Sequence, residues 1–168
     1  MSTLEDFVSG GLAADETVIV IATPVHVRLL ETLLTARGID LEAVRGRDHY
    51  IVCDAEEILS TFVENGWPNE ERFKKTISEI LVRARKSGRR VRAFGEMVAL
   101  LWAQGHKGAT VRLEHLWHMY CQSEQFSLYC AYPKTGLPQD ASAAIDAICA
   151  AHTRVISPEG RIPSTAGW

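Results

Sequence analysis

Three side chains that can move protons or bind a ligand each follow an apolar segment of the chain. They are His26, Asp54 and Glu96, and the segments before them are rich in β-branched and other apolar residues. An imidazole beside a carboxylate can serve as an acid–base pair, and the same groups can hydrogen-bond a small molecule. The spacing therefore predicts chemistry or ligand binding at the ends of several strands.

The turn that carries His26 has the position of a phosphate-binding loop but lacks its residues. It reads Ala22-Thr23-Pro24-Val25-His26, whereas a phosphate loop needs glycines, a lysine and a Ser/Thr hydroxyl for magnesium. Thr23 is expected to cap a helix that has Pro24 at its first position. The positive end of that helix disfavours imidazolium, so a neutral His26 ring could bind a ligand, act as a base or tie the turn to a neighbouring loop.

The two carboxylates leave alternatives open. Asp54 precedes Ala-Glu-Glu, which is typical of a helix N-cap, but it could also join Glu96 in binding magnesium. Glu96 fits either a ligand site or an ion pair with Arg92 or another arginine. Glu114 and His118 lie four residues apart, which favours a solvated helical contact over a metal site.

The elements that position these residues alternate between strands and helices. This alternation predicts a single α/β domain with a mainly parallel sheet, whose ligands collect at the carboxyl ends of the strands. That rule adds Tyr132 to the expected site. The strands are predicted at residues 18–22, 50–53, 91–94, 126–132 and 154–156, and the helices at 24–37, 54–65, 69–87, 96–102, 109–124 and 141–152.

Composition narrows the class of protein. The 168 residues carry a net charge of −3, so no overall basic excess indicates nucleic acid as the partner, although a basic run extends from Arg83 to Arg92. No apolar run approaches the roughly 20 residues that span a bilayer. The cysteines lack CxxC spacing, which favours buried thiols in a reducing cytoplasm; they are Cys53, Cys121, Cys130 and Cys149.

Several motifs, taken in order, resemble the MEDS family, the methanogen/methylotroph sensory domain. The most specific are the Ala-Thr-Pro-x-His turn and the Phe-Gly-Glu-Met run. The resemblance covers about residues 7–156. It implies a three-layer fold related to RecA-like and KaiC-like ATPases that lacks a Walker A motif and serves signalling. The other matching segments are Asp54-Ala55 with Leu59, Phe62, Gly66, Pro68 and Phe73, then Leu101-Trp102, Leu113-Glu114 with Trp117, and Cys130-Ala-Tyr-Pro133.

Family members are often joined to histidine kinases or DNA-binding regulators. We therefore predict a sensory domain over residues 1–156 and a flexible tail over 157–168, signalling through such a partner or as a homodimer. We expect a small organic ligand, no cofactor, no metal and no catalysis. The expected ligand contacts are Thr23, Pro24, His26, Asp54, Glu96 and Tyr132. The alternatives are an enzyme that uses His26 with Glu96 or Asp54, and a structural interaction module.

Overall fold

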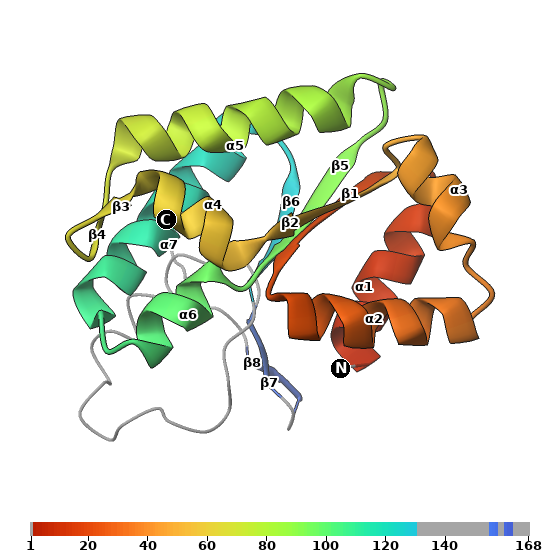
Figure 1. Cartoon of the computed structure of the whole chain (residues 1–168), viewed down its shortest axis with the longest axis horizontal. Coiled ribbons are helices and arrows are strands. Elements are labelled where there is room, and N and C mark those ends of the chain that lie inside the picture. Colours follow the sequence, from red (N-terminus) through yellow and green to blue (C-terminus); the bar gives the residue numbers. More distant parts are fainter. Residues whose placement is uncertain (1, 131–154, 158–159, 163–168) are drawn as a thin grey trace.

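A computed structural model describes residues 2–130, 155–157 and 160–162. Its centre is a four-stranded sheet in the order β2-β1-β5-β6, and all three neighbouring pairs are parallel. Helices cover both faces, which gives three layers (Figure 1). The α/β class and the parallel sheet are therefore confirmed. The strands are β1 (Thr17–Ala22), β2 (Tyr50–Asp54), β5 (Val91–Gly95) and β6 (Ser127–Cys130).

Successive residues of β1 point to opposite faces of the sheet, and each face has its own helices. Val18 and Val20 pack with one set of helices, whereas Ile19 and Ile21 pack with the other. All six residues of β1 are buried, which explains why its sequence is almost wholly apolar. The first set is α1 (Ser2–Ala13), α2 (Pro24–Ala36) and α3 (Leu41–Gly46), and the second is α4 (Ala55–Phe62), α5 (Glu70–Arg85), α6 (Met97–Ala103) and α7 (Lys107–Glu124).

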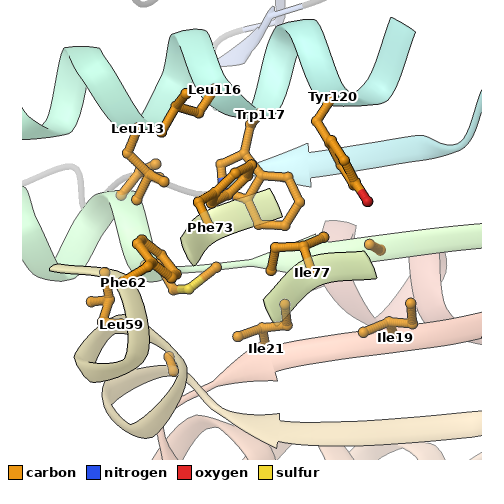
Figure 2. Close-up of a cluster of buried hydrophobic side chains, with 14 of the residues drawn as sticks. Ile19, Ile21, Leu59, Phe62, Phe73, Ile77, Leu113, Leu116, Trp117 and Tyr120 are labelled. Carbon is orange, nitrogen blue, oxygen red and sulfur yellow. The ribbon is translucent and has the colours of Figure 1, made fainter. Parts of the chain in front are cut away.

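The larger core lies between the sheet and helices α4 to α7 (Figure 2). Phe73 of α5 stands at its centre, edge-on to Phe62, Trp117 and Tyr120 at ring-centroid distances of 5.3, 4.9 and 5.8 Å. Edge-to-face pairs of this kind add roughly 0.5–1.5 kcal/mol each beyond the burial of apolar area. This core fixes the helices that follow β2 and β5.

Helix α4 ends earlier than the sequence pattern predicts. The prediction of a helix through Asn65 is wrong, because α4 stops at Phe62 and a short hairpin follows. Asn65 and Gly66 have φ values of 51° and 75°, the left-handed conformation that a two-residue hairpin turn requires. The paired strands are β3 (Val63–Glu64) and β4 (Trp67–Pro68).

Strands β7 (Val155–Ser157) and β8 (Gly160–Ile162) form a separate antiparallel pair. β7 matches the predicted terminal strand, and β8 lies within the segment predicted as a flexible tail. The domain boundary at residue 156 stays a prediction. The predicted helix at 141–152 and Tyr132 lie outside the described residues. No helix in the described part of the chain is long and apolar enough to span a membrane.

Candidate functional site

The strand order places a topological switch point between β1 and β5. After β1 the chain adds β2 on one side and then crosses back to add β5 on the other. Ile21 and Gly95 pair at the carboxyl ends of these two strands. The helices that follow β1 and β5 lie on opposite faces of the sheet (Figure 1). Ligands of open α/β sheets bind in the crevice that this arrangement creates.

Glu96 lies at this point and connects the two turns. Its backbone N–H donates to Ile21 O at 3.1 Å, which extends the β1–β5 ladder by one residue. Its side chain is 8% exposed. Oε1 accepts the backbone N–H of Thr23 at 2.5 Å, and Oε2 lies 2.7 Å from His26 Nδ1. One buried carboxylate therefore holds the first turn of α2 to the start of α6.

The start of α2 follows the prediction in its position but not in its capping. Pro24 occupies the first helical position, and Thr23 lies at the cap position. The Thr23 side chain makes no capping hydrogen bond, and its backbone N–H is directed to Glu96 instead. The proline offers no N–H at this position, and the Glu96 carboxylate accepts the N–H of the residue before it.

His26 is the exposed member of the group. Its side chain is 56% exposed, compared with 8% for Glu96. Nδ1 contacts the buried carboxylate, and Nε2 makes no hydrogen bond within the described part of the chain. A carboxylate that binds Nδ1 in this way orients an imidazole for proton transfer or for hydrogen bonding at Nε2. The alternative that Glu96 pairs with Arg92 is wrong, because Arg92 bonds Glu16 and the Phe7 carbonyl.

Asp54 lies at the same edge but serves α4. It is the register partner of Ala22 at the end of β2. Its Oδ1 accepts the backbone N–H groups of Glu56 and Glu57 at 2.8 and 3.3 Å, which is the N-cap that the sequence suggests. Within the described residues Asp54 has no hydrogen bond to His26. The structure thus joins Thr23, His26 and Glu96, and leaves Asp54 beside them.

A family model described as the methanogen/methylotroph, DcmR sensory domain, abbreviated MEDS, matches residues 1–153. The chain belongs to the MEDS family. No curated protein and no solved structure matches it significantly. The match covers Thr23, His26 and Glu96, so the linked turns lie inside the MEDS domain.

Two other features of this MEDS domain lie away from the linked turns. Glu114 is 2% exposed, so the expectation of a solvated Glu114–His118 pair is wrong, and His118 instead contacts Gln122 at 3.1 Å. Among the residues that the structure describes, no three His, Cys, Asp or Glu side chains are arranged to hold a metal ion.

Burial raises the pKa of the Cys121 thiol to about 12 and that of the Cys130 thiol well above its ordinary value.

The basic run of the MEDS domain lies toward the opposite edge of the sheet, where a shallow depression of about 470 Å³ is lined by residues 14–16 and 87–90. Arginines of this run form ion pairs with acidic residues of other elements. The carboxylate in each pair partly compensates the charge of its arginine, which weakens the attraction of that arginine for an external polyanion. The pairs are Arg83–Asp48, Arg85–Glu124, Arg89–Asp15 and Arg92–Glu16.

Proposed function

We propose that this MEDS domain is a non-hydrolytic sensor that binds a small organic ligand at the carboxyl edge of its sheet. Thr23, Pro24, His26 and Glu96 form the centre of the proposed site, with Asp54 beside them. Tyr132, which lies outside the described residues, stays a further proposed contact. The observation that supports it is the Glu96 carboxylate at the switch point, with the half-exposed His26 ring bound to it. The description of the family as a sensory domain supports the same function.

The first turn of α2 supports binding without nucleotide hydrolysis. A phosphate loop wraps phosphate with successive backbone N–H groups and a lysine. Here Pro24 has no N–H, and the N–H of Thr23 is already donated to Glu96. We also propose that the fold is a degenerate relative of RecA-like ATPases. The helix-covered parallel sheet supports this relationship, and a comparison of its strand order with those of RecA-like ATPases would test it.

We further propose that the ligand signal passes to a protein partner, such as a histidine kinase or a DNA-binding regulator, or to a second copy of the chain. The turns joined by Glu96 start helices on opposite faces of the sheet. A ligand that hydrogen-bonds His26 would therefore be connected through Glu96 to both helical layers. Co-purification with candidate kinases, with and without the retained ligand, tests this part of the proposal.

Native mass spectrometry of protein purified from its source tests the binding function. We expect a retained small molecule in the parent protein and its loss in His26→Ala, with an unchanged thermal midpoint. Arg28→Ala, an exposed change on the same helix, is the matched control and should retain the molecule. A retained nucleotide, or equal retention by His26→Ala, would contradict the proposal. A parent protein with no retained molecule would favour a structural interaction module.

One observation favours a second candidate function, an acid–base enzyme. His26 Nδ1 lies 2.7 Å from Glu96 Oε2, within the contact distance that a carboxylate-oriented base requires. Incubation with the molecule that co-purifies would distinguish the functions. Its chemical conversion by the parent protein but not by His26→Ala indicates an enzyme, whereas release of the intact molecule indicates a sensor.

A further inference from the structure

The hydrogen bonds of Glu96 determine which nitrogen of His26 carries a proton. The backbone N–H of Thr23 is an obligatory donor, and it uses Oε1 of the carboxylate. An ionised carboxylate accepts at both oxygens, so Oε2 also calls for a donor. The atom at Oε2 is His26 Nδ1, 2.7 Å away. Nδ1 must therefore carry the hydrogen of that bond.

A neutral imidazole has one donor nitrogen and one acceptor nitrogen. With the hydrogen on Nδ1, Nε2 is left with a free lone pair. Nε2 belongs to a side chain that is 56% exposed, in the turn that follows β1 at the β1–β5 switch point. A ligand that meets His26 thus finds an acceptor, and Glu96 acts behind the ring as a positioning residue.

We infer that Glu96 makes His26 a hydrogen-bond acceptor, and that the site selects neutral ligands carrying a donor, such as an O–H or N–H group, over acceptor-only or anionic molecules. This inference rests on the proposed function, because it specifies the ligand of the same site. The selection follows from the unfavourable contact between two acceptors, which leaves the lone pair of Nε2 unsatisfied when an acceptor-only ligand excludes water.

Glu96→Gln gives an isosteric test of this polarity. The Thr23 N–H still needs an oxygen, so the amide oxygen of the glutamine takes the place of Oε1. The amide NH₂ group then faces His26 Nδ1 and donates to it. Nδ1 becomes the acceptor, and the hydrogen of the neutral ring moves to Nε2. The variant should therefore present a donor to the ligand where the parent protein presents an acceptor.

The experiment is ¹⁵N NMR of the His26 ring at about pH 9, where an ordinary imidazole is neutral. We expect the Nδ1–H tautomer in the parent protein and the Nε2–H tautomer in Glu96→Gln. Glu57→Gln, an exposed change on α4, is the matched control and should leave the tautomer unchanged. A parent protein with the Nε2–H tautomer, or a Glu96→Gln variant that keeps the Nδ1–H tautomer, would overturn the inference.

The ligand preference is tested with propan-2-ol and acetone, which share a carbon skeleton but differ in the O–H donor. In the parent protein, half-saturation of the His26 shift should need roughly three- to tenfold less propan-2-ol than acetone. Glu96→Gln should lose or reverse that preference. Equal responses, or no response to either probe, would overturn the ligand class. A molecule retained in native mass spectrometry would still support the proposed function in that case.

The parent protein alone can overturn the inference if Glu96→Gln does not fold. Its tautomer and its preference between the two probes are both measured without any substitution. A folded Glu96→Gln variant is recognised by a far-ultraviolet circular dichroism spectrum and a thermal transition like those of the Glu57→Gln control.

Discussion

Glu96 and His26 share a hydrogen bond, but the fold depends on them to different degrees. Glu96→Ala removes the acceptor of the Thr23 N–H at a buried position, which should lower the free energy of unfolding by about 1–3 kcal/mol. His26→Ala removes a half-exposed ring and should change it by less than about 0.5 kcal/mol. Urea denaturation of both variants gives the comparison. Equal losses would show that His26, too, is needed to hold the turn.

His49 should make the stability depend on pH. Burial lowers its pKa, as do the charges of Arg89 and Arg47, while Asp15 opposes the shift. Its Nε2 has no hydrogen-bond partner among the described residues and lies 3.8 Å from Asp15 Oδ1. Because the unfolded chain binds the proton more readily, stability should be complete above the ordinary imidazole pKa of about 6.5 and fall as the pH drops below it.

The variant His49→Gln removes the titrating group and should flatten this slope between about pH 7 and pH 5. Urea midpoints across that interval measure the effect. His115→Gln, an exposed change on α7, is the control and should keep the slope of the parent protein. Identical slopes in His49→Gln and the parent protein would show that other groups carry the pH dependence.

For individual residues, the sequence predicts the positions of the polar side chains better than it predicts their contacts. His26 and Glu96 are recognisable because each follows an apolar strand, and Asp54 is recognisable as an N-cap. The bond between His26 and Glu96 spans 70 residues and depends on β1 and β5 being neighbours. Local patterns do not specify which strands are adjacent, so the partner of Glu96 could not be read from them.

Among the elements, the strands and long helices are predictable because each has a clear apolar period. Helix α1, in contrast, contains Gly10 and Gly11, which lower intrinsic helix propensity. The reason for Gly11 is tertiary: an added Cβ would lie 2.6 Å from Arg92 Cδ and 2.8 Å from Val18 Cγ2. Asn65-Gly66 is a typical hairpin-turn pair and indicates the hairpin after α4. The helical spacing of Phe62 and Val63 favoured a longer helix in the sequence prediction.

Gly11→Ala should therefore loosen the contact of α1 with the sheet. We expect a loss of about 1–3 kcal/mol in the free energy of unfolding, because an added methyl must displace Arg92 and Val18. Gly46→Ala in α3 is the matched control, since its added Cβ would meet no described atom within 4 Å beyond its chain neighbours and its own helix backbone. That variant should be neutral or more stable by up to about 1 kcal/mol. Equal effects in denaturant titrations would show that α1 accommodates the methyl group.

For the whole molecule, the partly buried thiols should report on unfolding. Cys53, Cys121 and Cys130 are free, and burial raises the pKa of each. In a Cys149→Ser background, these three thiols should react with an aromatic disulfide reagent at pH 8 only as fast as the protein opens. Sub-denaturing urea should accelerate the reaction in step with the unfolded fraction. Rapid reaction in native buffer would contradict this expectation.

The α/β class with a parallel sheet was predictable because strands and helices alternate along the chain, whereas the three layers were expected from the resemblance to the MEDS family. The distribution of helices between the faces was not, since it follows from the strand order. That order, β2-β1-β5-β6, is what makes the carboxyl ends of β1 and β5 the switch point.

Side-chain hydrogen bonds to other elements hold both ends of strand β5, and this fixes its length. Arg92 near its start bonds Glu16 and the Phe7 carbonyl, and Glu96 just beyond its end bonds the first turn of α2. Removing or inserting one residue between them would turn the following side chains to the other face of the sheet. The interactions of Arg92 and those of Glu96 could then not form together. The family should therefore tolerate length variation in the loop before β5, at Gly88, far better than within the strand.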